Sequence, residues 1–200
     1  MSFIEDFISA RDRIIASSID IISDAGLASL NINNISRRTN LSEMMIYKCF
    51  TNTDEILVEV VNLYFRFDKG IFSTLESRNI TNLEKIKMYV DNYGTYYNNY
   101  FSLSAIMLQY EELLHNTNTR EIVQQGFLER RENLAKIFDN AISNGEIKAD
   151  VKGEMLADSL LGMFIVCSLN RRVMVMSRSF KDEIDIQYSK WIESLCNNKV

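Results

Sequence analysis

The chain has 200 residues, 46% of them hydrophobic and 24% charged, and its formal net charge is −5. These values are typical of a folded globular protein and exclude wholesale disorder, and the length suits one or two helical domains. The acidic balance also excludes a surface that is basic throughout. Any contact with nucleic acid must therefore come from a few locally placed groups.

Proline is absent from the sequence, although average usage of about 5% would give roughly ten prolines in a chain of this length. Because proline is the strongest helix breaker, its absence predicts an all-α fold. The three cysteines are far apart and match neither a metal site nor a disulfide pattern. We therefore expect a reduced protein that holds no metal and no cofactor.

Two stretches were considered as targeting or membrane segments. The N-terminus, MSFIEDFISARDR, is acidic where a signal peptide needs a basic start and a long apolar stretch. The longest apolar run, MLADSLLGMFIVCSL, is too short to span a bilayer and contains an aspartate. Both observations favour a cytoplasmic protein.

The first half of the chain opens with three predicted helices. The first covers Arg11–Ala25, and Gly26 follows where a helix C-cap favours a left-handed residue. The second is predicted from an N-cap at Asn31 to about Thr39. Asn40 then tolerates the positive φ of a tight break, and Ser42 is a good N-cap for a short helix that ends at Phe50.

A long fourth helix is predicted to begin at a capping-box-like pair, Asn52 and Glu55. From about residue 82, two further helices are expected with a break near Ser102, and a third is expected to stop at Gly145. Two closing helices are predicted at about 151–177 and 181–196. No internal repeat and no long linker interrupts this series.

The segment NINNISRRTNLSEMMIYKCF has the layout of a helix-turn-helix, with Ile35, Leu41, Ile46 and Phe50 facing inward. Methionine and tyrosine can contact thymine methyl groups, while a tyrosine hydroxyl or a lysine can bond phosphate. On pattern alone, the same corner is also compatible with an ordinary helical core. Five side chains of its second helix are expected to point outward: Glu43, Met44, Met45, Tyr47 and Lys48.

The stretch RDRIIASSIDIISDAGLASLNINNISRRTNLSEMMIYKCFTNTDEIL resembles, position by position and without gaps, the N-terminal domain of the tetracycline-repressor (TetR) family. The resemblance covers about a quarter of the chain. The residues that match the family's pattern are Arg11, Ile14, Ile15, Ser17, Ser18, Gly26, Ile32, Ile35, Leu41, Ser42, Ile46, Tyr47, Phe50, Asn52 and Leu57.

The resemblance implies a helix-turn-helix DNA-binding domain at residues 1–52 and a helical effector-binding and dimerisation domain at residues 53–200. It also implies a homodimer that binds a palindromic site in double-stranded operator DNA and is released by a small-molecule effector, most simply as a repressor. The residues expected at the DNA are Arg11, Asn31, Asn33, Arg37, Ser42, Glu43, Met44, Met45, Tyr47, Lys48 and Thr53.

The sequence departs from the family's pattern at several of these positions. Glu43, Met44 and Cys49 stand where the family often has lysine, glycine, and histidine or tyrosine, and Thr53 replaces a frequent lysine that bonds DNA phosphate. Residues 1–50 carry five basic and six acidic side chains. Fewer basic groups predict weaker binding with a shallower salt dependence. Compensation is expected from Arg11, Arg13, Arg37, Arg38, Asn31 and Asn33.

An aromatic stripe in the second half of the chain has two possible roles. Tyr89, Tyr93, Tyr97 and Tyr100 recur at helical spacing, and a lone stripe of this kind is more often core packing. The alternative is the wall of an apolar cavity for a hydrophobic or aromatic effector. The residues predicted to line this cavity are Tyr89, Tyr93, Tyr97, Phe101, Met107, Tyr110, His115, Met163 and Phe164.

The two closing helices are candidates for self-association. The first is apolar on nearly every side, and such a helix must be covered on more than one face. The pattern fits a central core helix with a cover helix, and it equally fits a four-helix bundle formed by two copies. The TetR resemblance favours the bundle. The expected interface residues are Leu160, Phe164, Cys167, Tyr188, Trp191 and Leu195.

Enzymatic functions find little support in the sequence. The pair Glu112 and His115 has the spacing of a di-iron ligand motif, but that site needs the motif twice and the chain has one histidine. No phosphate-binding loop, dinucleotide motif or nucleophile elbow is present. The remaining alternative to a regulator is a helical small-molecule or protein-binding module that has lost operator binding.

Overall fold

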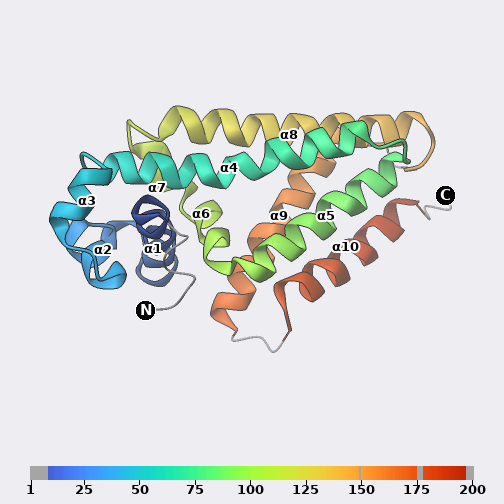
Figure 1. The fold of residues 1–200 in the computed structure, drawn as a ribbon. Helices are drawn as coiled ribbons and strands as arrows, with labels where there is room; N and C mark the ends of the chain where they lie inside the picture. Colours follow the sequence, from blue (N-terminus) through green and yellow to red (C-terminus); the bar gives the residue numbers. More distant parts are fainter. Residues whose placement is uncertain (1–8, 149, 175–177, 197–200) are drawn as a thin grey trace. The chain divides into compact units, whose positions relative to one another are not determined.

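The computed structural model describes residues 9–148, 150–174 and 178–196. Within these ranges the chain forms ten α-helices and two short 3-10 helices, η1 and η2, with no strand (Figure 1). The predicted all-α fold is confirmed. The helices pack into two compact units, and the boundary between the units falls within two long helices, α4 (Thr53–Ser77) and α8 (Arg120–Ser143). The domain boundary expected after residue 52 stays a prediction.

Unit 1 contains the described residues up to Phe65 together with Ser102–Gln124. In addition to the first turns of α4 and α8, its helices are α1 (Ala10–Ala25), η1 (Leu27–Ser29), α2 (Ile32–Thr39), α3 (Glu43–Cys49), α6 (Ala105–Leu108) and α7 (Tyr110–His115). The first residue of the 3-10 helix η2 (Phe101–Ser104) belongs to unit 2, and its other three residues belong to unit 1.

The caps predicted for the helix-turn-helix are present. The Asn31 side chain accepts a hydrogen bond from the Asn34 backbone N–H at 2.9 Å, and the Ser42 hydroxyl oxygen accepts one from Met45 at 3.3 Å. Between the two helices, Asn40 adopts the left-handed conformation, with φ 55° and ψ 27°. Asparagine tolerates this region because its short polar side chain costs little there. Local sequence thus determines where α2 ends and where α3 begins.

The core of unit 1 consists of aliphatic side chains from α1, α2, α3 and α4. Ile14, Ile35, Ile46 and Ile56 are fully buried, and Phe50 is nearly so. Leu41, expected inside the turn, is half-buried. The burial of Ile46, with the C-cap residue Phe50, fixes which side of α3 faces outward.

Unit 2 contains the second part of α4 and of α8, together with α5 (Asn82–Asn99), α9 (Gly153–Val173) and α10 (Phe180–Cys196). Helix α10 packs against both α5 and α9. Gly94 permits the close approach of α5 to α10, because a Cβ at this position would lie 3.1 Å from a methyl carbon of Ile184.

Two predicted helices differ in detail from the structure. The segment after Ser102 divides into α6 and α7, which are separated by a turn at Gln109. The backbone N–H of Gln109 donates to the backbone oxygen of Ile106 in this turn. The first closing helix, expected to about residue 177, ends at Val173, and residues 175–177 lie outside the described residues. Gly145, with φ 72°, follows α8 as predicted.

Helix α9 is 21 residues long, and an apolar window of 18 residues within it has a mean hydropathy of 1.2, enough by length and composition to cross a membrane. Core helices of soluble proteins pass the same test, and 44% of this apolar window is buried inside the chain. Its buried side chains include Leu156, Leu160, Phe164 and Cys167. The helix therefore serves as a core element of unit 2.

Candidate functional site

Two arginines of α1 bind the C-terminal carbonyl groups of α2 and α3, the two helices of the helix-turn-helix. The Arg13 guanidinium donates to the backbone oxygen of Thr39, the last residue of α2, at 2.6 Å. The Arg11 guanidinium donates to the backbone oxygen of Cys49, the last residue of α3, at 2.8 Å. A cation at a helix C-terminus satisfies an unpaired carbonyl and opposes the negative end of the helix dipole. Both helices are thereby fixed relative to α1.

Arg11 was expected at the DNA, but the structure gives it several partners within the chain. Besides the Cys49 carbonyl, its guanidinium lies 3.2 Å from a carboxylate oxygen of Glu59 and 4.1 Å from the centre of the Phe50 ring. A guanidinium engaged in this way at the junction of α3 and α4 positions the third helix. Its predicted contact with DNA stays untested.

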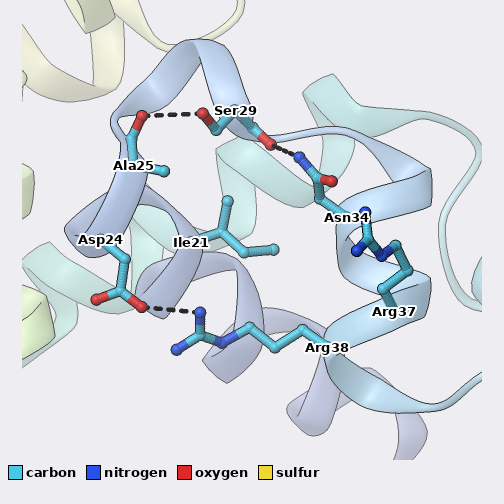
Figure 2. Close-up of a pocket in the computed structure, with 7 residues that line it drawn as sticks. All are labelled: Ile21, Asp24, Ala25, Ser29, Asn34, Arg37 and Arg38. Carbon is cyan, nitrogen blue, oxygen red and sulfur yellow. Dashed lines mark hydrogen bonds and ion pairs between the residues drawn. The ribbon is translucent and has the colours of Figure 1, made fainter.

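A third arginine joins α2 to α1 beside an open hollow of about 450 Å³ (Figure 2). The guanidinium nitrogens of Arg38 lie 2.8 Å from a carboxylate oxygen of Asp24 and 3.7 Å from one of Asp20. In the same view, the Asn34 amide donates to the backbone oxygen of Ser29 at 2.8 Å. These contacts orient α2 while leaving its other side exposed.

The outward side of α3 is mainly apolar. The exposed fractions of the Met44, Met45 and Tyr47 side chains are 69%, 38% and 54%, and Glu43 and Lys48 are exposed as well. Large apolar side chains at such exposure cost hydration free energy in the isolated chain, so a contiguous group of them marks a contact surface. We call these five residues the α3 outer face.

The other residues predicted at the DNA fall into two groups. Asn31 and Ser42 are N-caps, so their side-chain oxygens are engaged in α2 and α3, and Thr53 is half-buried at the start of α4. Asn33 and Arg37 are exposed and lie four residues apart, which places them on one face of α2. The structure therefore leaves Asn33 and Arg37 open to a ligand on this helix.

Few cations of the head are available to a polyanion. Arg11, Arg13 and Arg38 are engaged as described above. Among the residues that the structure describes, Arg37 and Lys48 form no ion pair. These two side chains are the strongest candidates for phosphate contacts.

Six of the residues predicted to line an effector cavity belong to unit 2. Tyr89, Tyr93 and Tyr97 are no more than 2% exposed, and their rings lie 5.8–6.3 Å from the ring of Phe164. Phe101 lies under the guanidinium groups of two arginines of α9, at 4.4 and 4.1 Å from its ring centre. Met163, on α9, is half-buried. Met107, Tyr110 and His115 belong to unit 1, where Met107 is buried and His115 exposed.

A charged network inside unit 2 was not predicted from the sequence. Arg130 of α8 donates to Asp68 of α4 through Nε at 2.9 Å and through Nη2 at 2.8 Å, and both residues are more than 90% buried. The Tyr93 hydroxyl donates to the same carboxylate. Burial raises the pKa of Tyr93 well above its usual value, so its hydroxyl stays protonated. No short motif could have revealed this network, because 62 residues separate Asp68 from Arg130.

The residues predicted for self-association are partly covered by the chain itself. Leu160, Phe164, Cys167 and Tyr188 are buried within unit 2, and burial raises the pKa of the Cys167 thiol to about 12. Trp191 and Leu195 are half-buried. Helix α9 instead exposes a stripe of Met155, Val166, Leu169 and Val173, and a Cβ added at Gly162 would meet nothing within 4 Å. These five residues are called the α9 stripe.

Comparison with solved structures identifies the fold. A TetR-family transcriptional regulator from Agrobacterium tumefaciens superposes with a TM-score of 0.76 at 15% identity, covering 92% of this chain and 96% of that chain. The fold is that of the TetR family. The ketosteroid transcriptional regulator KstR2 of Mycobacterium tuberculosis has a TM-score of 0.80 at 11% identity, covering 92% of this chain and 93% of that one.

A third similar structure is that of the transcriptional regulator FadR from Bacillus subtilis in complex with stearoyl-CoA. It has a TM-score of 0.71 at 16% identity, and the match covers 94% of this chain and 98% of that one. No protein-family model and no curated protein matches the sequence. The TetR fold is thus carried by a sequence far from these structures.

Proposed function

We propose that this chain is a cytoplasmic DNA-binding transcriptional regulator that represses from a palindromic operator and is released by a small apolar effector. The observation that carries the proposal is the α3 outer face. A short helix with Ile46 buried beneath it presents Met44, Met45, Tyr47 and Lys48 outward, as the second helix of a helix-turn-helix does. Arg11 holds this helix at its C-terminus, and Arg13 and Arg38 hold α2 beside it, so the motif is rigid for docking into the major groove.

DNA binding is tested with the purified full-length protein and its own upstream DNA, by fluorescence anisotropy. We expect the Tyr47→Ala, Lys48→Ala double variant to weaken binding at least tenfold, because it removes a phosphate contact and an apolar contact in each protomer. A Lys190→Ala variant, changed at an exposed lysine of α10, should bind as the wild type does. Binding that the double variant retains in full would overturn the assignment of α3 as the recognition helix.

The effector is proposed to bind at the aromatic core of unit 2. A core that serves packing alone has no need of a buried ion pair, since apolar residues of similar volume are often as stable. Asp68, Arg130 and Tyr93 would supply the polar contacts of a site otherwise lined by aromatic rings. The TetR-like structures named above include a ketosteroid regulator and one with bound stearoyl-CoA, which supports an apolar effector.

Release from DNA requires that the effector bind the DNA-free state more tightly than the DNA-bound state, because equal affinity shifts no equilibrium. Stearoyl-CoA, stearate and a ketosteroid are suitable first probes in the anisotropy assay. A Tyr93→Phe variant should keep its DNA affinity and lose most of the response to an active compound. Tyr188→Phe, which removes the hydroxyl of another buried tyrosine of unit 2, on α10, is the matched control. Equal responses from both variants would contradict the role given to Tyr93.

The homodimer is proposed to form through the α9 stripe of two copies. The positions of Met155, Gly162, Val166, Leu169 and Val173 follow spacings of three, four and seven residues, which aligns them along one side of the helix. Gly162 leaves room for a partner helix to approach closely. A dimer is also what a palindromic operator requires, since each protomer reads one half-site.

The second candidate is a helical ligand-binding module that has lost operator binding. The commitment of Arg11, Arg13 and Arg38 to contacts within the head is the observation in its favour. The anisotropy experiment separates the two functions, because the module would show neither sequence-specific nor salt-dependent DNA binding.

A further inference from the structure

The α3 outer face has an unusual chemistry for a surface that meets DNA. Met44, Met45 and Tyr47 expose mostly apolar atoms, and α3 contains no arginine. Met44 and Lys48 are four residues apart and Met45 and Lys48 three, so the lysine lies between the two methionines on the same side of the helix. The contact made by the centre of this helix is therefore largely apolar.

The major groove offers a single apolar group to such a surface. Guanine presents two acceptors, adenine an acceptor and a donor, and cytosine a donor, whereas thymine alone adds a C5-methyl group. Guanine is most often read by arginine, and Arg11, Arg13 and Arg38 are engaged inside the head. The exposed Arg37 lies on α2 and is assigned here to phosphate, so α3 itself presents no arginine to a base. Flexible methionine side chains fit well against methyl groups at slightly different positions.

Helix α2 adds a polar side chain that can bond adenine, the base that pairs with thymine. Asn33 is exposed at the start of α2, while the neighbouring Asn31 is engaged as the N-cap. An asparagine amide can bond both N7 and N6 of adenine, the partner of thymine. Both helices of the motif thus favour A·T pairs.

We propose that this chain reads its operator through thymine methyl groups, which Met44 and Met45 contact, and through adenine, which Asn33 bonds. The half-sites are A·T-rich at the positions that α3 faces. This inference rests on the proposed DNA-binding function and specifies the DNA that it takes.

The size of the α3 outer face favours DNA over a protein partner. A specific protein interface buries at least about 1,000 Å² in total, with an apolar centre and a polar rim. Two exposed methionines and a tyrosine form a ridge along one seven-residue helix, and an α-helix is an element that the major groove admits. The exposed Lys48 on the same ridge complements the phosphates that border the groove.

The test uses deoxyuridine, which lacks only the methyl group of thymidine and keeps its hydrogen bonds. The full-length protein first selects duplexes from a random-sequence library, and one selected duplex is then synthesised with deoxyuridine in place of each half-site thymidine. We expect binding to weaken by about fourfold for each contacted methyl group, the factor that corresponds to burying one carbon of this size. The Met44→Ala, Met45→Ala variant should bind both duplexes equally.

The variant comparison separates a methyl contact from a change in DNA shape. A shape effect of deoxyuridine would persist in the double-alanine variant, whereas a lost contact would not. Both methionines are exposed, so the substitutions leave the core of the head intact, and Leu128→Ala is the control at an exposed apolar residue of unit 2. Selected sites that bind equally well with deoxyuridine would overturn the inference and leave the proposed function standing. A library that yields no bound sequence would overturn both.

Discussion

The basic side chains of the head have two roles: some stabilise the fold by contacts within the chain, and others are exposed to a ligand. Arg11 and Arg13 cap the C-termini of α3 and α2, and Arg38 pairs with Asp24. Arg37 and Lys48 are left for contacts outside the chain. This division explains how a head with few basic residues keeps α3 rigid, and for the proposed function it predicts that DNA affinity comes from few phosphates.

The buried ion pair between Asp68 and Arg130 should contribute to stability as a unit. Arg130→Ala should lower the free energy of unfolding by about 3–5 kcal/mol, because it leaves a buried carboxylate without its partner. The Asp68→Leu, Arg130→Met double variant should recover most of that loss, since no charge remains buried. Urea unfolding of the three proteins measures both effects. A double variant as unstable as the single one would show that the pair does not act as a unit.

At the scale of secondary-structure elements, the N-terminus of α5 is capped from a distant part of the chain. Glu146 accepts a hydrogen bond from the backbone N–H of Leu83 at 2.9 Å and one from the Asn82 amide at 2.7 Å. Burial raises the pKa of Glu146, but these hydrogen bonds outweigh it, and the pKa lies below its ordinary value of 4.5. The negative charge also suits the positive end of the helix dipole.

Stability should therefore depend on the protonation of Glu146 in a defined direction. A depressed pKa in the folded state means that the carboxylate stabilises the fold above about pH 4.5 and that this stabilisation is lost as the pH falls below that value. Glu146→Gln should cost about 1 kcal/mol at pH 7, measured by urea unfolding, and the difference from the wild type should shrink toward zero as the pH falls below about 4.5. Glu193→Gln, at an exposed position of α10, is the control. A difference that stays constant with pH would contradict the role of the charge.

Local signals predicted the elements well, whereas contacts between distant residues could not be predicted. The caps at Asn31, Asn40 and Ser42 depend on side chains within three residues, so the sequence alone locates them. The Arg11–Cys49 contact joins residues 38 apart and the Glu146 cap joins residues 64 apart, and no spacing rule connects them.

Helix α9 shows a second limit of the sequence. Because it is apolar on nearly all sides, its pattern cannot say which side faces the core. Leu160, Phe164 and Cys167 were predicted for the dimer interface, and the structure buries them inside unit 2. The exposed side carries the α9 stripe instead, so the interface proposal now rests on those residues.

At the scale of the whole molecule, the proposal requires two copies that bind two half-sites. Leu169→Glu should convert the dimer into a monomer of 23.2 kDa, because a charge in an apolar interface lacks a partner. Light scattering after gel filtration measures the mass. Leu128→Glu, at an exposed leucine of α8, should remain a dimer. A wild-type protein that elutes as a monomer at micromolar concentration would contradict the interface.

The net charge of −5 limits the general electrostatic attraction that the proposed dimer would have for DNA. General attraction to a polyanion is weak for such a protein, so specific contacts of the α3 outer face must supply much of the binding free energy. Arg37 and Lys48 in each of two heads would neutralise about four phosphates, which predicts a slope of about −3.6 for the logarithm of affinity against the logarithm of salt concentration.

The most direct test of this account is therefore the salt dependence of DNA binding by the wild type and by Lys48→Ala. We expect a slope of about −3.6 for the wild type and of about −1.8 for the variant, which lacks one phosphate contact in each protomer. Binding that is absent, or that has the same slope in both proteins, would contradict the claim that α3 of this chain docks on DNA.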